Sequence, residues 1–150
     1  MISRAILILP RLFLGVIFSV AAFHKIAGGG FPSHLAAFLD QTLPNATGAY
    51  QAFARAVVFP NAPVVAILVM IGETFVAVAM LVGGATRLAA GVAILLLLNY
   101  MLAKGMTFWS PASNDAADIV LAILVGVGAA GRVWGLDAVL KRRYPRVPLW

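Results

Sequence analysis

Residues 63–81 form an apolar run that is long enough to cross a bilayer and that carries one carboxylate, Glu73, near its middle. An α-helix needs roughly 20 apolar residues to cross the ~30 Å hydrocarbon core of a membrane. A lone carboxylate at that depth is costly unless it is protonated or paired. This run therefore predicts a helix that is packed inside a bundle, with a polar partner for Glu73.

Three further apolar runs can supply that bundle. The predicted helices cover residues 5–27, 63–82, 86–103 and 114–131, and a basic tail follows at 132–150. The chain is 63% hydrophobic and 11% charged, whereas soluble domains are roughly 45–50% apolar and ~25% charged. This composition excludes an ordinary soluble domain. The predicted fold is all-α, with residues 1–150 forming a single four-helix transmembrane bundle.

The connection at residues 28–62 is too polar and too rich in Pro and Gly to cross a membrane. Ser33 is the expected N-cap of a short helix with an apolar face, and residues 50–58 form a second short helix. Both are predicted to lie in the membrane interface. Trp134 and Trp150 in the tail are predicted interface anchors.

The basic residues predict the orientation of the helices. With four crossings, one side collects Arg4, Arg87, Arg132, Lys141, Arg142, Arg143 and Arg146, and the other holds Lys25, Arg55 and Lys104. Cytoplasmic loops carry the excess of Lys and Arg, so both termini are predicted to be cytoplasmic. The net charge of +6 lies at the ends of apolar runs, so we expect the lipid bilayer, and not a nucleic acid, as the partner of these residues.

Arg11 is the predicted partner of Glu73. It lies within the first apolar run, at a depth from which its side chain can reach the middle of the second predicted helix. A guanidinium offers a fork of donors to a carboxylate. Such a pair either only fixes which helices meet, or forms the charged wall of a ligand cavity or proton path.

A second group of polar residues is predicted in the outer half of the bundle or at its rim. It comprises His24, Lys25, Asn99, Asn114 and Asp118. These residues suit a quinone head group, because its carbonyl oxygens accept hydrogen bonds and a carboxylate can relay protons. The alternative is ordinary capping of helix ends at a wet interface. The candidate catalytic residues are Glu73 and Asp118, and the candidate cofactor-binding residues are Arg11, His24, Lys25, Asn99 and Asn114.

Two further sequence patterns predict contacts between the helices. Asn99 is expected to hydrogen-bond across a helix interface. Small or polar residues recur at steps of four and are predicted to face the bundle; they are Asn114, Asp118, Ala122, Gly126 and Ala130.

No metal site is predicted. His24 and His34 lack a third ligand, and the chain has no Cys, which excludes a disulfide framework and a Cys-ligated zinc or iron–sulfur cluster. The methionines do not form a soft-metal motif and are expected to be packing residues.

Residues 71–74 (IGET) and 81–88 (LVGGATRL) resemble the DoxX/DoxD family pattern, in which a mid-helix Glu precedes an apolar half-helix, a glycine turn and a Thr-Arg start. Residues 11–15 (RLFLG) and 24–26 (HKI) resemble the first helix of the same family. A weaker likeness, closer to DoxD-like members, lies at residues 114–118 and 134–137 (WGLD).

The resemblance implies a four-helix protein of the bacterial inner membrane that is linked to redox metabolism. DoxD-like members are the membrane subunit of thiosulfate:quinone oxidoreductase and work with a second subunit, DoxA, whereas other DoxX members associate with thiol-redox and oxidative-stress proteins. Carried over, Arg11, Glu73 and Arg87 would be family positions, with Lys25 at the outer rim.

Three functional hypotheses follow. The first is a multi-pass membrane subunit of a redox complex, which binds a quinone or similar lipophilic electron carrier between its helices while a partner protein performs the substrate chemistry. The second is a non-enzymatic scaffold that recruits a redox or maturation partner. The third is a small proton-coupled carrier in which Glu73 or Asp118 changes protonation. A homo-oligomer is compatible with each.

Overall fold

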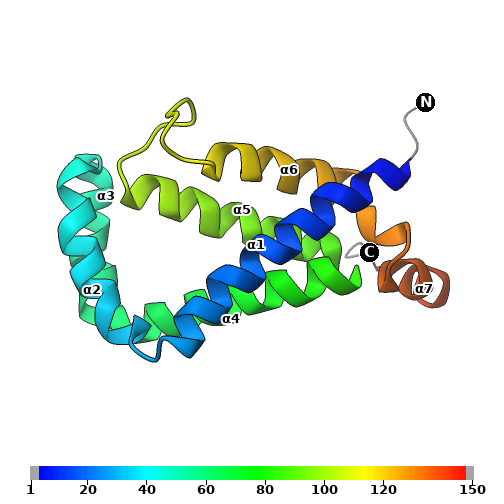
Figure 1. The fold of residues 1–150 in the computed structure, drawn as a ribbon, viewed down its shortest axis with the longest axis horizontal. Coiled ribbons are helices and arrows are strands. Elements are labelled where there is room, and N and C mark those ends of the chain that lie inside the picture. The colour runs from blue at the N-terminus through cyan, green and yellow to red at the C-terminus, as the bar shows by residue number, and fades with distance from the viewer. Residues whose placement is uncertain (1–3, 148–150) are drawn as a thin grey trace.

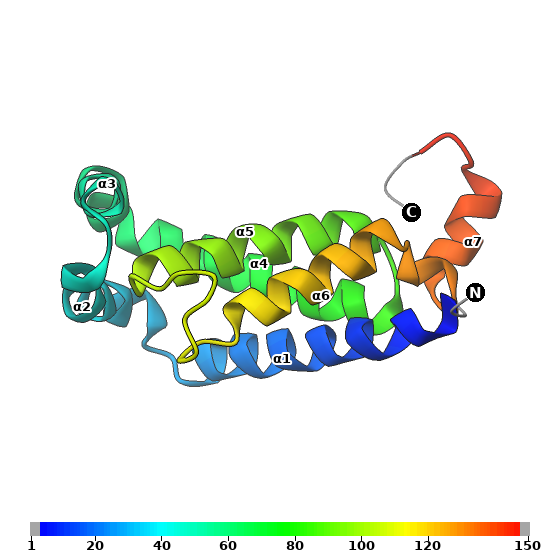
Figure 2. The same ribbon diagram turned by 90° about the horizontal axis from the view of Figure 1, so that it is seen from above.

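The computed structural model describes residues 4–147, and the regular secondary structure of these residues is helical throughout, with no strand (Figure 1). Four long helices lie side by side, namely α1 (Ile8–Ala27), α4 (Ala62–Val82), α5 (Thr86–Ala103) and α6 (Asp115–Val127). Helix α1 packs on α4, α4 on α5, α5 on α6, and α6 back on α1 (Figure 2).

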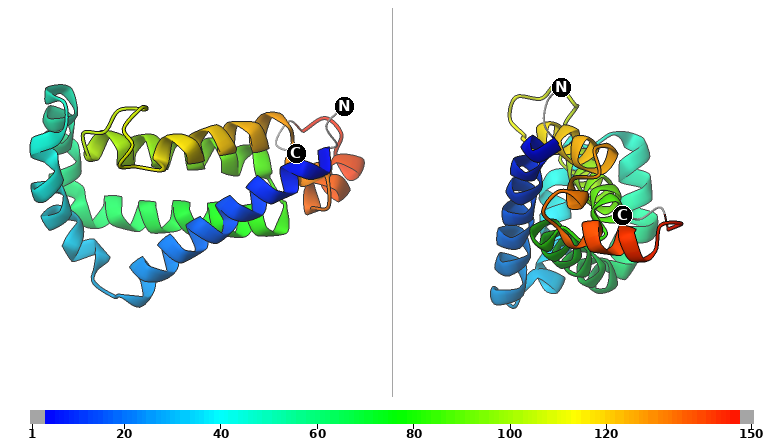
Figure 3. Two further views of the ribbon diagram at one scale, coloured as in Figure 1. Left: turned by 45° about the horizontal axis from the view of Figure 1, so that its top comes forward. Right: turned by 90° about the vertical axis from the view of Figure 1, so that its right-hand side faces the viewer.

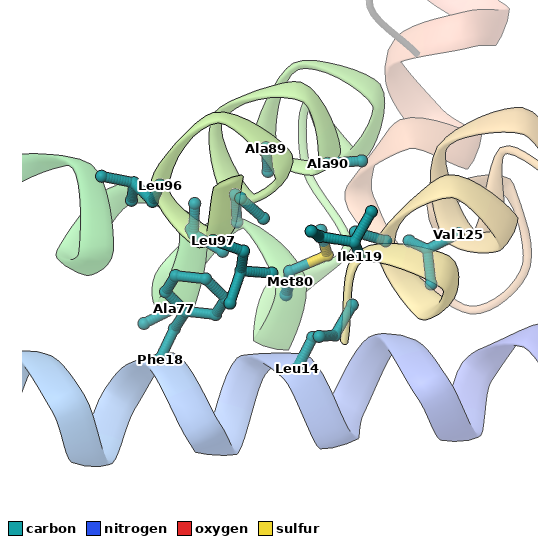
Figure 4. Packing of buried hydrophobic residues seen from close by; sticks show 14 of the residues in the cluster. Leu14, Phe18, Ala77, Met80, Ala89, Ala90, Leu96, Leu97, Ile119 and Val125 are labelled. Atoms are coloured by element: carbon teal, nitrogen blue, oxygen red, sulfur yellow. The ribbon is translucent and has the colours of Figure 1, made fainter. Parts of the chain in front are cut away.

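The core lies where these four helices meet. Leu14 of α1 points toward Met80 of α4, and Phe18 of α1 lies beside Ala77 of α4 (Figure 4). Small residues allow the helices to approach closely. A Cβ added to Gly15 would lie 2.9 Å from Leu81 Cδ2 and 3.2 Å from the Leu81 backbone nitrogen, so α1 and α4 approach each other closely at this glycine.

Within residues 4–147, three helical stretches are long and apolar enough to cross a membrane: Ala5–Ala27, Gly48–Val82 and Thr86–Ala103. The fourth predicted helix, at residues 114–131, is shorter in the structure. Helix α6 has 13 residues and covers about 20 Å, and the chain then turns at Ala129 (φ 50°) into the 3₁₀ helix η5 (Ala130–Arg132).

The row of small and polar residues in the fourth helix was predicted to face the bundle, and most of this row does. Asp118, Ala122 and Ala130 are buried as predicted, and a Cβ on Gly126 would contact Ala90 of α5. Asn114, at the start of the row, is exposed to solvent or lipid.

The connection between α1 and α4 folds into short helices that lie across one end of the long helices (Figures 1 and 3). They are α2 (Phe31–Thr42), the 3₁₀ helix η2 (Leu43–Asn45), α3 (Gly48–Phe53), the π-helix η3 (Ala54–Val58) and the 3₁₀ helix η4 (Phe59–Asn61). We call α2, η2, α3 and η3 together the roof. The two predicted short helices are both present.

The predicted N-cap at Ser33 is wrong. Helix α2 begins at Phe31, with Gly30 as its N-cap, because Pro32 is tolerated in a first helical turn. The Ser33 hydroxyl instead donates a hydrogen bond back to the Gly30 carbonyl, at 2.8 Å. In the second short helix, Thr47 is the N-cap, and its hydroxyl accepts a hydrogen bond from the backbone N–H of Tyr50.

The opposite end of the molecule is held together by α7 (Leu136–Arg143). The fully buried Asp137 accepts hydrogen bonds from the backbone N–H groups of Ala85 (2.6 Å) and Thr86 (3.0 Å) and from the Thr86 hydroxyl (2.5 Å). This carboxylate therefore caps the start of α5. Of the predicted interface anchors, Trp134 is 88% exposed at this end, and Trp150 lies outside the described residues.

Candidate functional site

Arg11 does not pair with Glu73, so that prediction is wrong. The Arg11 guanidinium donates hydrogen bonds to the carbonyls of Ala130 (3.3 Å), Val133 (3.2 Å) and Trp134 (3.1 Å). It lies beside Gly83, about 15 Å along α4 from Glu73 at ~1.5 Å per residue. Carbonyls of the turn between α6 and α7 lie closer to Arg11 than the Glu73 carboxylate does. They accept hydrogen bonds from both terminal nitrogens of the guanidinium, whereas its buried Nε has no hydrogen-bond partner among the described residues.

Glu73 is instead paired with Lys25 at the end of α1. The Lys25 Nζ donates to Glu73 Oε1 at 2.5 Å, and the Tyr100 hydroxyl of α5 donates to the same oxygen at 2.7 Å. The Glu73 side chain is fully buried, and among the described residues its second oxygen, Oε2, has no hydrogen-bond partner. Three helices thus meet at one carboxylate that is only partly satisfied.

The Lys25 ammonium is held on several sides. Its Nζ lies 5.2 Å from the centre of the Phe31 ring and 5.6 Å from that of Tyr100, distances at which a cation is attracted to an aromatic face. The side chain is 21% exposed. An ammonium carries three N–H donors, and Glu73 takes one, so donors remain for a ligand.

Lys25 and Tyr100 border a cavity of about 660 Å³ that lies between the roof, α4 and α5. Small-molecule sites typically measure ~300–1,000 Å³ and are lined mainly by apolar side chains with a few polar groups. This cavity fits that description, because its polar lining residues are Lys25, Tyr50, Asn99, Tyr100 and Lys104 and the others are apolar or Gly. Gly72 packs on Leu96 at the cavity wall, where an added Cβ would lie 3.3 Å from Leu96 Cδ1.

Asn99 bonds across a helix interface, as predicted. Its Oδ1 accepts a hydrogen bond from the Tyr50 hydroxyl of α3 at 2.9 Å, which ties α5 to the roof. Its amide nitrogen keeps two N–H donors at a residue that lines the cavity.

The predicted site residues fall into two groups in space. Lys25 and Asn99 line the cavity, and Glu73 lies behind Lys25 and Tyr100. The cavity lining does not include His24, which is exposed, or Asn114, which is also exposed. Nor does it include Asp118, which is buried in α6.

Sequence reasoning missed Tyr50, Tyr100 and Lys104 as site residues. A tyrosine in an apolar segment carries a hydroxyl that needs a partner when it is buried, and this signal was present at Tyr100, next to Asn99. Lys104 lies at the cavity rim and pairs with Asp115. Within residues 4–147, no three His, Asp or Glu side chains come together as a metal site would require.

The DoxX family model matches residues 6–105, which is two thirds of the chain and includes Lys25, Glu73, Asn99 and Tyr100. No curated protein and no solved structure gave a significant match. Because the family model matches well over half of the chain, from the first long helix to the end of α5, this protein belongs to the DoxX family.

Proposed function

We propose that this DoxX-family protein is the membrane subunit of a redox complex and that it binds a quinone or similar lipophilic electron carrier in the cavity beneath the roof. The observation that carries the proposal is the cavity itself, which joins an apolar wall to Lys25 and Asn99, two residues with hydrogen-bond donors to spare. Carbonyl oxygens of a quinone are acceptors, so these residue types fit its head group.

When bound, a quinone takes up two electrons and two protons. The chain's own residues then have separate tasks. Lys25 and Asn99 donate hydrogen bonds that orient the ring, and Glu73, bonded to both Lys25 and Tyr100, holds or releases a proton beside the cavity. Asp118 stays a predicted proton relay in α6. The electrons come from a partner protein, which also performs the substrate chemistry.

The proposal includes four membrane crossings, with both termini in the cytoplasm and the protein in a bacterial inner membrane. Its support is the course of α6. This helix starts where Asp115 pairs with Lys104 near the roof, and it leads to Ala130, whose carbonyl accepts a hydrogen bond from Arg11 at the opposite end. The chain thus runs the length of the long helices a fourth time, although α6 alone is short.

The quinone content of the protein, purified in mild detergent, tests this function. We expect near-stoichiometric quinone in the wild type and clearly substoichiometric quinone in the double variant Lys25→Met/Glu73→Gln, whose affinity should fall about tenfold or more, since a hydrogen bond from a charged donor is worth ~1.5–3 kcal/mol. The double variant avoids leaving Glu73 buried without its cation. Lys141→Met, at the far end of the molecule, is the control and should keep its quinone. Wild-type quinone no higher than in an unrelated membrane protein would contradict the proposal.

A scaffold that recruits a redox or maturation partner is the second candidate. The observation in its favour is the surface at α7, where Trp134 is 88% exposed and Val139 is 62% exposed beside Arg142 and Arg143. Aromatic residues and Arg are enriched at protein interfaces. Under this hypothesis Trp134→Ser abolishes co-purification of a specific partner while the quinone content stays at background.

A further inference from the structure

Five residues that line the cavity are also exposed on the outer surface of the molecule, and all five are large and apolar. They are Phe38 (43% exposed), Phe53 (47%), Val57 (45%), Leu68 (61%) and Leu95 (68%). We call these residues the rim. The polar lining residues are less exposed than the rim. An opening toward water would expose polar groups, so the composition of the rim indicates an opening toward hydrocarbon.

The position of the rim in the fold supports the same direction. Leu68 lies in α4 and Leu95 in α5, and both helices belong to stretches that can cross a membrane. The other three rim residues come from the roof, which lies across the ends of these helices (Figure 3). The cavity therefore opens sideways, between α4 and α5 and beneath the roof.

The roof has a hydrophobic cluster of its own, and four of its buried residues also line the cavity. Leu35, Leu39, Tyr50 and Val58 are buried in this cluster, separately from the core between the long helices. Val57 and Val58 belong to the π-helix η3, and π-helical turns are frequent at functional sites. Here the π-helix contributes one residue to the rim and the next to the cavity wall.

From this arrangement we infer that the rim is a lateral portal for the hydrocarbon tail of an amphiphilic ligand. The ligand reaches the cavity from the bilayer, its acceptor-bearing head lies near Lys25 and Asn99, and its tail leaves between Leu68 and Leu95 into the lipid. The inference rests on the proposed function for the nature of the head. Beyond that function, the ligand carries a hydrocarbon tail, is dissolved in the membrane, and enters the cavity from the side.

Two related quinones can test the portal in the purified protein reconstituted in nanodiscs. One is 2,3-dimethoxy-5-methyl-1,4-benzoquinone, which has no tail, and the other carries a decyl tail on the same ring. The portal variant is Leu68→Trp/Leu95→Trp, which fills the opening with exposed side chains and leaves the core intact. The matched control is Ile67→Trp/Leu102→Trp, two exposed positions on the same helices that do not line the cavity.

We expect the portal variant to bind the tailed quinone about tenfold more weakly or worse, while its affinity for the tailless quinone stays within about twofold of wild type. The control should bind both as the wild type does. Equal losses of both quinones in the portal variant, or no loss of either, would overturn the portal while leaving quinone binding in place. Failure of the wild type to bind either quinone would overturn the proposed function, and the tail route with it.

A spin label can test the direction of the opening without any quinone. The chain has no Cys, so Leu95→Cys can carry a single label in reconstituted protein. Relaxation by molecular oxygen with little relaxation by a water-soluble nickel chelate would show that Leu95 faces lipid, as an opening toward lipid requires. Relaxation mainly by the nickel chelate would overturn the portal, whatever the protein binds.

Discussion

Glu73 is fully buried, and both groups that satisfy it come from other helices. Removing one partner of a buried ion pair leaves an uncompensated charge, which costs about 3–5 kcal/mol, whereas replacing both partners by neutral residues of similar size costs much less. Whether Glu73 destabilises or stabilises the fold therefore depends on Lys25. This coupling can be measured.

We expect Lys25→Met to lower the free energy of unfolding by about 3–5 kcal/mol and Lys25→Met/Glu73→Gln to recover most of that loss. Denaturant unfolding in mild detergent measures both. Lys104→Met is the control, since the pair of Lys104 with Asp115 is partly exposed and worth about 1 kcal/mol or less. Strictly additive losses of the two single changes, Lys25→Met and Glu73→Gln, would show that they do not interact.

Tyr100 gives a prediction of smaller size. Tyr100→Phe keeps the ring beside Lys25 but removes the hydroxyl that donates to Glu73, so we expect a loss of about 1–3 kcal/mol in unfolding free energy. Tyr144→Phe, at an exposed tyrosine outside the bundle, should change stability by less than about 0.5 kcal/mol. An effect of Tyr100→Phe no larger than this control would show that the hydroxyl contributes nothing to the buried carboxylate.

The sequence showed that Glu73 needs a partner, but it could not show which one. Depth along a helix follows from the rise per residue, and by this measure Arg11 is deep enough to reach Glu73. Two features that depth alone does not reveal decide which residue pairs with Glu73. The slant of α1 brings Lys25 to the middle of α4, and the free carbonyls after α6 accept the hydrogen bonds of Arg11. Asn99 was predictable as a cross-interface residue because an amide among apolar neighbours has few alternatives.

At the scale of elements, α7 caps α5 from a distance of some fifty residues in the chain. Asp137 is fully buried and accepts three hydrogen bonds, so Asp137→Ala should lower the unfolding free energy by at least ~2 kcal/mol and release α7. Hydrogen exchange of the backbone amides of α7 and of the first turn of α5 measures the release. Asp40→Ala, at an exposed carboxylate, should leave both unchanged. Full protection of α7 in Asp137→Ala would contradict this role.

Gly105 joins α5 to the roof at a position that no other residue fits. Its φ is +67°, and an added Cβ would overlap the backbone carbonyl of Asn45. Gly105→Ala should therefore lower the free energy of unfolding by more than about 1 kcal/mol. Gly91→Ala, in the open on α5, should be neutral or raise it by up to about 1 kcal/mol. If both changes had the same effect on thermal unfolding, the contact between Gly105 and Asn45 would not be needed for the roof.

Element boundaries followed the sequence where capping and turn residues were unambiguous. Helix α5 runs from Thr86 to Ala103, as predicted, because the Gly83-Gly84 turn before it stops α4 in a left-handed conformation at Gly83. The fourth helix was predicted too long because the left-handed turn residue is an alanine, Ala129, and the glycines beside it are equally typical of close packing between membrane helices. The roof could be predicted as short helices but not as the cover of a cavity, because that depends on its contacts with α4 and α5.

For the whole molecule, the orientation in the membrane is testable with single cysteines in the Cys-free chain. With four crossings, His34→Cys in the roof should react with an impermeant maleimide in intact spheroplasts, whereas Arg142→Cys in α7 should react only after permeabilisation. Labelling of both positions from outside would mean that α6 does not cross and would leave three crossings.

Every residue that lines the cavity falls between Lys25 and Lys104, inside the region that the family model matches, whereas the acceptors of Arg11 and the cap of α5 come from residues 130–137. The cavity lining and the contacts that hold the opposite end of the molecule together thus come from different parts of the chain. A substitution in the cavity lining therefore leaves the hydrogen-bond acceptors of Arg11 and the cap of α5 in place, and a substitution at residues 130–137 leaves the cavity lining in place.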